Sequence, residues 1–125
     1  MALLVQKFGG TSLGSIERIN SVARRISTSK QLGNEIVVVV SAMGNTTNEL
    51  NKLANSISKN PPKRELDMLL ATGEQVSIAL LAMALNEIGI PAISMTGSQV
   101  GIITESSHGK ARILEIRTER LEKLL

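Results

Sequence analysis

The sequence predicts an α/β fold, with a mostly parallel sheet flanked by helices, and three observations lead to it. Short apolar runs alternate along the chain with segments whose apolar residues recur every three or four positions. The run Ile36–Val40 is β-branched throughout and apolar on both faces, as is typical of a buried parallel strand. Glycine-containing loops separate such runs from the helical segments that follow them. This alternation favours parallel strands joined by right-handed crossovers.

The first part of the chain is expected to contain two strands joined by a helix. Leu3–Lys7 is an apolar run that ends at Gly9–Gly10, which suits a strand followed by a tight turn. A helix then ends at Gly33–Asn34. Its apolar face consists of Ile16, Ile19, Val22, Ala23 and Ile26. Ile36–Val40 follows as the second strand.

Two capping-box patterns mark the helices that come next. After a loop over Ser41–Asn45, Thr46 and Glu49 form the first pattern, at the start of a helix that ends before Pro61–Pro62. Its expected apolar face is Leu50, Leu53, Ala54 and Ile57. A further helix is marked by Leu66, Leu69 and Leu70. The second pattern, Thr72-x-x-Gln75, predicts a break there and a fresh helix from Gly73 or Glu74.

The helix after the expected break, Val76–Ile88, is apolar almost all round and should be buried on most sides. Ala92–Met95 is expected to be a third strand, and Thr96–Thr104 a loop with an extended piece. Ala111–Ile116 is expected to be another strand, and Thr118 to cap a last helix.

Composition limits the classes of function. The chain has 125 residues, of which 42% are hydrophobic and 20% charged, so it is one domain or part of one. Three or four strands beside so apolar a helix leave surfaces that need further neighbours, which indicates part of a domain. No cysteine is present, which excludes disulfides, thiolate metal sites and a cysteine nucleophile. A net charge of +3, with no Trp or Tyr and one Phe, argues against nucleic-acid binding.

Neither a membrane segment nor a signal peptide is expected. No apolar run reaches the 18 residues that span a bilayer, and the longest clean run has five, Ile36–Val40. The amino terminus lacks the charged region and cleavage site of a signal peptide. We therefore expect a cytoplasmic protein.

The segment Lys7-Phe8-Gly9-Gly10-Thr11-Ser12 is a candidate phosphate-binding loop. Its two glycines allow close approach of the backbone to an anion, and the following helix offers free N–H groups. Lys7 adds a compact positive charge suited to a phosphate. The order of residues differs from the G-x-x-x-x-G-K-[ST] loop. A plain strand–turn–helix junction explains the same residues about equally well.

A second candidate site follows the strongest strand, at the edge where open α/β sheets bind ligands. Ser41 to Glu49 offers hydroxyls and amides before a helix, and capping leaves Ser41 and Thr47 unexplained. Glu74 begins the most apolar helix. It either complements the helix dipole or faces the ammonium group of a ligand.

His108, the single histidine, is read as a solvated loop residue without a catalytic role. No cluster of residues has the spacing of metal ligands. Any metal is therefore expected to arrive with a substrate.

Four segments closely resemble the start of the aspartokinases, members of the amino-acid kinase family with its carbamate-kinase-like fold. They are LLVQKFGGTSL, VVVVSAMGNTTNEL, ELDMLLATGEQVSIALLAMAL and SMTGSQVGIITESSHGKARI, in the order found in that family. The resemblance covers essentially the whole chain. The combination of K-[FY]-G-G-[TS]-S, V-x-S-A-x-x-x-x-T-[ND] and G-E distinguishes aspartokinases from their relatives.

The resemblance implies transfer of the ATP γ-phosphoryl group to the side-chain carboxylate of L-aspartate, with Mg²⁺ arriving on the nucleotide. By this resemblance Lys7 contacts the ATP phosphates, and Phe8, Gly9 and Gly10 line them. Ser41 lies at the boundary between nucleotide and substrate. The residues implied for aspartate are Thr47 and Glu74, with Asn45, Thr46, Asn48 and Glu49 beside them.

The resemblance also implies what is missing. Residues 1–125 match about the first half of the kinase domain, so the sheet is expected to be incomplete on its carboxyl-terminal side. The nucleotide-binding half and the regulatory domains have no counterpart here. By the same resemblance, we expect the parent enzyme to be a homo-oligomer that serves lysine, threonine and methionine synthesis. Because half of the kinase domain is missing, we expect the isolated chain to be inactive. Two alternatives are another amino-acid kinase, acting on glutamate, acetylglutamate or a nucleotide, and a non-catalytic module that only binds a partner chain.

Overall fold

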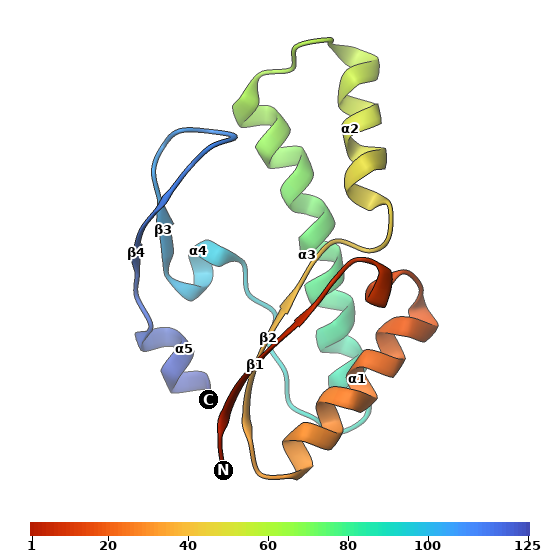
Figure 1. The fold of residues 1–125 in the computed structure, drawn as a ribbon, viewed down its shortest axis with the longest axis vertical. Coiled ribbons are helices and arrows are strands. Elements are labelled where there is room, and N and C mark those ends of the chain that lie inside the picture. Colours follow the sequence, from red (N-terminus) through yellow and green to blue (C-terminus); the bar gives the residue numbers. More distant parts are fainter.

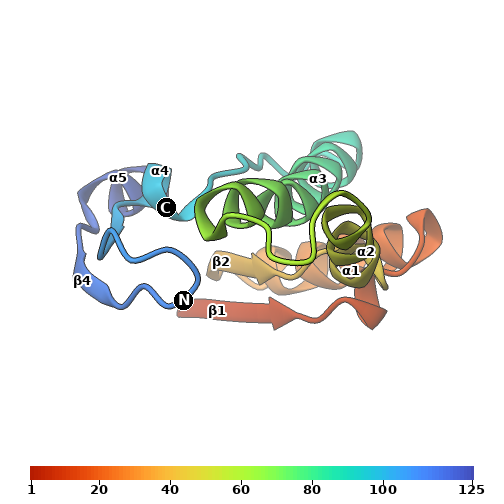
Figure 2. The ribbon, with the colours of Figure 1, turned by 90° about the horizontal axis from the view of Figure 1, so that it is seen from above.

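The computed structural model describes residues 1–125 as an α/β arrangement in which helices pack on a pair of parallel strands (Figures 1 and 2). The elements are β1 (Leu3–Phe8), a short 3-10 helix η1 (Thr11–Leu13), α1 (Ile16–Gln31), β2 (Glu35–Val40), α2 (Thr46–Ile57), α3 (Lys63–Glu87), α4 (Gly97–Val100), β3 (Ile102–Thr104), β4 (Ile113–Ile116) and α5 (Glu119–Leu124). The predicted strand–helix–strand order of the first forty residues is confirmed.

The parallel pair β1–β2 confirms the predicted sheet type. Leu3 pairs with Glu35 and Phe8 with Val40, with α1 as the crossover. Both strands therefore end at the same edge, and so do the two loops that leave them. A separate antiparallel pair, β3–β4, has an irregular register between Ile103 and Thr104. This hairpin lies on the other side of α3 from α2 (Figures 1 and 2).

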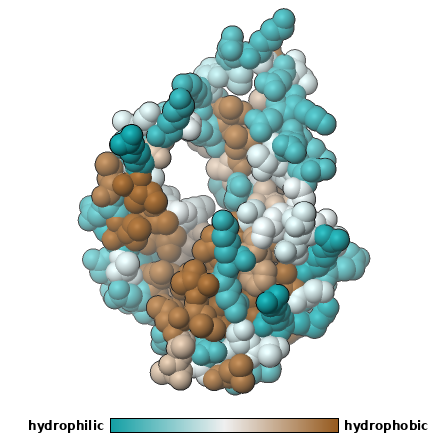
Figure 3. Space-filling model, in the orientation of Figure 1, coloured by the Kyte–Doolittle hydropathy of each residue, from teal (hydrophilic) through white to brown (hydrophobic).

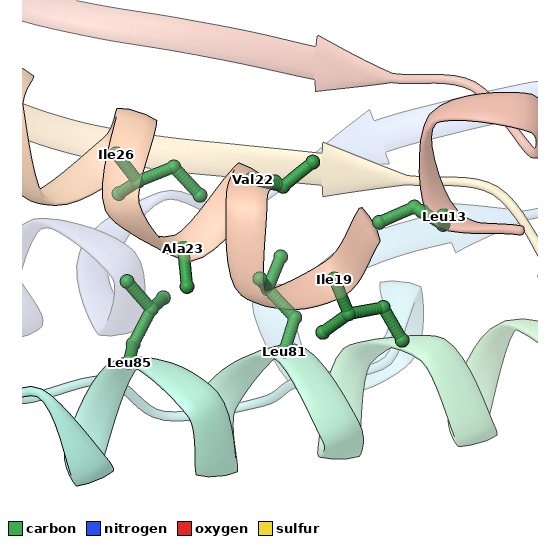
Figure 4. Packing of buried hydrophobic residues seen from close by; sticks show 7 residues of the cluster. All are labelled: Leu13, Ile19, Val22, Ala23, Ile26, Leu81 and Leu85. Atoms are coloured by element: carbon green, nitrogen blue, oxygen red, sulfur yellow. The ribbon is translucent and has the colours of Figure 1, made fainter. Parts of the chain in front are cut away.

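The hydrophobic core lies along α1. Figure 4 shows α1 between the strands and α3, with its apolar side chains directed to both. The fully buried cluster consists of Leu13, Ile19, Val22, Ala23, Ile26, Leu81 and Leu85. Ile36, Val38 and Val40, every second residue of β2, pack against this cluster, and so does Phe8 at the end of β1. The predicted apolar face of α1 is thus confirmed except at Ile16, which is exposed.

The predicted break at Thr72–Gly73 is wrong, because α3 runs without interruption for 25 residues. The Thr72 hydroxyl donates to the carbonyl of Leu69 at 2.6 Å, inside the helix, and caps nothing. Gly73 is buried rather than placed at a helix end. A capping box needs unpaired N–H groups, and here the preceding turns of α3 already supply their partners. Glu74 therefore lies in the middle of a helix and not in its first turn.

The carboxyl-terminal half of α3 is less buried than predicted. Ser77, Leu81 and Leu85 are buried against α1, but the opposite side carries Val76 and Met83, which are 51% and 65% exposed. Helix α3 is also the one helix long and apolar enough, by length and composition only, to cross a membrane. The sequence prediction had divided it in two and so found no such span. The core helices of soluble proteins meet the same criterion.

The capping box predicted at Thr46 is also wrong. Asn45 holds the N-cap position of α2, without a side-chain cap. The Thr46 hydroxyl instead donates back to the carbonyl of Met43 at 2.6 Å, so it stabilises the preceding turn. Of the predicted apolar face, Leu50 and Ala54 are half-buried and Leu53 and Ile57 are exposed.

No strand forms over Ala92–Met95, contrary to prediction. The backbone of Ala92 bonds to the side chain of Asn86 instead, which accepts from Ala92 N at 3.2 Å and donates to its carbonyl at 3.1 Å. Between the expected loop residues 96 and 104, Thr96 and Gln99 form a capping box at the start of α4, and β3 follows. Thr118 precedes α5 without capping it, since its hydroxyl donates to Glu122.

Two substitutions on α3 test this packing. Leu81→Ala should lower the free energy of unfolding by about 2–5 kcal/mol, because Leu81 is 4% exposed and its loss leaves a cavity between α1 and α3. Met83→Ala, two positions away on the exposed side, should change it by no more than about 0.5 kcal/mol. Urea or thermal unfolding of the complete protein measures both, and equal losses would contradict the packing described.

Candidate active site

The candidate site is built from two loops at the carboxyl ends of β1 and β2. Two backbone hydrogen bonds join these loops. Ser41 N donates to the carbonyl of Phe8 at 3.2 Å, and Gly44 N donates to the carbonyl of Gly10 at 2.9 Å. Parallel pairing thus brings together the two segments singled out in the sequence, residues 7–12 and 41–49.

Gly10 lies in close contact with the second loop. A Cβ atom at Gly10 would lie 2.9 Å from the carbonyl oxygen of Ala42 and 3.3 Å from that of Gly44. A Cβ at Gly9 would meet nothing within 4 Å. The two glycines therefore differ, since only Gly10 is required by packing. Gly44 completes the contact in a left-handed conformation, with φ of 48°.

The chain after Gly10 enters a 3-10 turn before α1 begins. Leu13 anchors this turn, because its side chain is fully buried and its N–H donates to the carbonyl of Gly10 at 3.2 Å. The helix α1 begins only at Ile16, after Ser15, whose hydroxyl accepts from Arg18 N at 3.2 Å. The Arg18 guanidinium donates to the carbonyl of Thr11 at 2.5 Å. The helix expected after the glycines is therefore present, but five residues lie between Gly10 and Ile16, the first residue of α1.

Lys7 lies next to the loop, on the face of the sheet opposite to the core. Successive residues of β1 point to opposite faces, and Phe8 packs against the core cluster. The Lys7 side chain is therefore exposed on the other face, beside Val39 of β2. It belongs to none of the ion pairs of the chain, which are Arg64–Glu65, His108–Asp67 and Arg117–Glu115. Its ammonium group is free to meet an anion.

Glu74 reaches the same region through the packing of α3. The adjacent Gly73 lies against the second loop, where an added Cβ would be 3.1 Å from the Ala42 side chain and 3.3 Å from that of Thr46. Glu74 itself is exposed. It lines a cleft of about 560 Å³ together with β2, Thr96 and Gly97. Figure 3 shows hydrophobic side chains around the hollow between α3 and the hairpin.

The remaining predicted residues lie on the first turn of α2. Asn45 and Thr46 stand where the second loop enters the helix, and Thr47, Asn48 and Glu49 are exposed on its first turn. The side chains of Thr46 and Glu49 do not cap α2. Helix capping, which the sequence suggested as the role of these two residues, is therefore not their role. Ser41 is half-buried directly after β2.

One contact was missed by the sequence reasoning. His108 is exposed in a loop, as expected, but its Nδ1 lies 3.2 Å from a carboxylate oxygen of Asp67, to which Gly109 N also donates at 2.9 Å. These bonds attach the tip of the hairpin to the start of α3. The two residues are 41 positions apart, and no pattern in the sequence links them.

An ion pair on the hairpin shifts the pKa values of both of its members. Hydrogen bonding and the charge of Arg117 lower the pKa of Glu115, and Glu115 in turn raises the pKa of Arg117, both on the exposed hairpin strand β4 and just after it. No three His, Cys, Asp or Glu side chains lie close enough together to hold a metal ion. The candidate site consists of backbone N–H groups, hydroxyls, two side-chain amides (Asn45 and Asn48), one lysine (Lys7) and two carboxylates (Glu49 and Glu74).

Comparison with known proteins gives a consistent set of similarities. The family model described as "Amino acid kinase family" matches residues 2–125. A protein named Aspartokinase from Bacillus sp. (strain MGA3) is 65% identical over 125 residues, which are 100% of this chain and 30% of that protein. An Aspartokinase from Geobacillus stearothermophilus is 62% identical over 125 residues, 100% of this chain and 31% of that protein.

A solved structure is similar as well. The crystal structure of aspartate kinase from Synechocystis matches with a TM-score of 0.84 and 61% identity, over 98% of this chain and 20% of that one. The chain thus spans about a third or less of the length of the proteins that it resembles.

The difference between the two glycines is testable. Gly10→Ala should lower the free energy of unfolding by about 1–3 kcal/mol, because the new methyl group meets the carbonyl oxygen of Ala42 and one loop must move. Gly9→Ala meets nothing, and it should leave stability unchanged or raise it by up to about 1 kcal/mol. Thermal unfolding without ligands measures both variants. The contact between the loops would be refuted by a Gly10→Ala protein as stable as Gly9→Ala.

Proposed function

Since its family model matches residues 2–125, the chain belongs to the amino acid kinase family, and we propose that it is part of an aspartokinase. The proposed reaction transfers the γ-phosphoryl group of ATP to the side-chain carboxylate of L-aspartate and gives 4-phospho-L-aspartate. In this proposal residues 1–125 form the amino-terminal half of the kinase domain. The protein would serve lysine, threonine and methionine synthesis in the cytoplasm.

The observation that carries this proposal is the 65% identity to an Aspartokinase across the full length of the chain. The geometry agrees with it. A phosphoryl transfer needs a nucleotide loop and an acceptor site next to each other, and the loops after β1 and β2 are joined by two hydrogen bonds. Glu74 follows Gly73, which packs on the second loop, and it lines the cleft next to α3.

The proposed chemistry needs no general base. An aspartate side chain has an ordinary pKa of about 3.9, so the attacking carboxylate is already ionised at neutral pH. One of its oxygens forms a bond to the γ-phosphorus while the bond to the bridging oxygen of the β-phosphate breaks, and ADP leaves. What the protein must supply is alignment and neutralisation of charge on the phosphates.

The residues of the first loop suit the nucleotide. Lys7 would neutralise charge on the phosphates, with Mg²⁺ arriving on the ATP. Backbone N–H groups of Gly9 and Gly10 would line the phosphates, supported by the packing of Phe8 on the core. Ser41, at the end of β2, would lie between nucleotide and acceptor.

The residues of the second loop and of α3 suit aspartate. Glu74 would face its ammonium group. Thr47 and the neighbouring Asn45 and Asn48 would hold its carboxylates from the first turn of α2, with Glu49 beside them. Thr46 would act by fixing the turn, since its hydroxyl is bonded to Met43. Because Gly73 touches Thr46, Glu74 and the first turn of α2 keep a fixed separation.

The function is tested first with the complete protein. It should form ADP from Mg²⁺-ATP in the presence of L-aspartate and not of L-glutamate or acetylglutamate. Residues 1–125 alone are proposed to be inactive, because about two thirds of the length of the relatives lies outside them. Turnover by the isolated chain would overturn the proposed division of the domain.

Lys7→Ala in the complete enzyme should reduce kcat by about 10²–10³, the cost of losing one group that stabilises transition-state charge. Lys59→Ala, an exposed lysine between α2 and α3, serves as the control and should keep normal kcat. A Lys7→Ala enzyme with more than half of the normal rate would remove Lys7 from the site.

Glu74→Gln and Thr47→Val should raise the KM for aspartate by about tenfold or more, as expected for lost hydrogen bonds to a charged ligand, with little change in the KM for ATP. Melting temperatures should hardly change, because both side chains are exposed. Glu87→Gln, at the last residue of α3, is the matched control. If the two variants melt early and show unchanged KM values, the assignment to aspartate is wrong.

A further inference from the structure

Arg18 connects the first turn of α1 to the segment that follows Gly9 and Gly10. Its Nη1 donates to the carbonyl oxygen of Thr11 at 2.5 Å, and its backbone N–H donates to the hydroxyl of Ser15 at 3.2 Å. The same carbonyl of Thr11 accepts from Gly14 N at 3.3 Å. Arg18 therefore binds the residues just before α1 with both its backbone N–H and its side chain.

The guanidinium of Arg18 is the only side-chain group that forms a hydrogen bond to residues 9–14. The other fixed points of this segment are backbone bonds at the carbonyl of Gly10 and the buried side chain of Leu13. Thr11 and Ser12 lie between these two points and are exposed. Without Arg18, the peptide unit of Thr11 would depend on a single long bond from Gly14.

We propose that Arg18 is a positioning residue that holds the turn after Gly10 in the conformation in which its N–H groups bind the phosphates of ATP. This inference rests on the proposed kinase function. Arg18 touches no reacting atom in this role. It acts through Thr11, whose carbonyl direction sets the orientation of the next N–H group, that of Ser12.

An arginine suits this role better than a lysine. Its planar guanidinium keeps its charge at every physiological pH and holds a fixed geometry toward a carbonyl group. The side chain lies over an open groove of about 330 Å³ that is also lined by Thr11, Ser12 and Arg25. Because Arg18 is outside the core cluster, shortening it leaves no cavity there. Its removal should therefore affect the turn more than the stability of the fold.

Three variants of the complete enzyme test the proposal. Arg18→Met keeps most of the aliphatic chain and removes the donor, and Arg18→Lys keeps the charge. Arg24→Met is the matched control, because Arg24 lies on the same helix and its guanidinium donates only to the hydroxyl of Ser21, one turn back. Initial rates at varied Mg²⁺-ATP and varied aspartate give the two KM values and kcat, and thermal unfolding is measured alongside.

Arg18→Met should raise the KM for ATP by about tenfold, as expected for loss of one charge-assisted hydrogen bond, and leave the KM for aspartate within twofold. Arg18→Lys should recover part of this loss, and Arg24→Met should match the unaltered enzyme. The proposal is overturned if Arg18→Met stays within twofold of normal. It is equally overturned if both KM values rise together with a lowered melting temperature that Arg18→Lys does not restore.

Hydrogen exchange without nucleotide separates this inference from the proposed function. The amides of Leu13 and Gly14, which donate to the carbonyls of Gly10 and Thr11, should exchange faster in Arg18→Met than in Arg24→Met, whatever substrate the enzyme uses. Unchanged exchange would show that Arg18 does not order the turn. If the unaltered enzyme forms no ADP with aspartate while the exchange differs as expected, the proposed function fails and the positioning of the turn stands.

Discussion

The close contact at Ala42 is the constraint on which the site depends. This small buried residue lies between two glycines that come from distant parts of the chain, Gly10 after β1 and Gly73 in the middle of α3. A Cβ at Gly10 would lie 2.9 Å from the Ala42 carbonyl oxygen, which is too close, and a Cβ at Gly73 would lie 3.1 Å from the Ala42 side chain, which is a tight contact. Three elements can therefore meet at one point. Each of them carries a residue proposed to contact a substrate.

The consequence of this contact is that the proposed nucleotide loop and acceptor site form one rigid unit. Lys7 and Gly9 precede the contact, Thr47 follows it as the second residue of α2, and Glu74 is adjacent to it along α3. A phosphoryl transfer gains its rate from alignment of groups that are individually weak. Interlocked backbones supply that alignment at lower entropic cost than long side chains that must be ordered one by one.

The sequence correctly predicted the helices and strands that depend on local residue patterns. β1, α1 and β2 follow from β-branched runs and helical periodicity, and the meeting of their loops follows from parallel pairing. The continuity of α3 could not be predicted, because Thr72-x-x-Gln75 matches a capping pattern whether or not a helix already precedes it. Only the tertiary contact with Ala42 explains a glycine there. The prediction of a strand over Ala92–Met95 was wrong because this segment pairs with neither β1 nor β2, and the backbone of Ala92 bonds to the side chain of Asn86.

The same limit applies to the site. The residue types of both loops indicated anion binding, but the difference between Gly9 and Gly10 depends on a neighbour 32 positions away, Ala42. The bond from Arg18 to Thr11 and that from Gly109 to Asp67 likewise depend on geometry that spacing does not encode. Contacts of this kind become visible only once the elements are packed.

The parallel pairing of β1 with β2 also sets an order for assembly during synthesis. Leu3 is made before its partner Glu35, which follows 32 residues later, roughly 2–6 s at 5–20 residues per second. During that interval β1 has no strand to pair with, and Leu4 and Phe8 have no core to enter. α2 and α3, by contrast, are adjacent in sequence and can meet soon after they emerge. Until β2 has been made, the apolar residues of β1 are therefore exposed to aggregation.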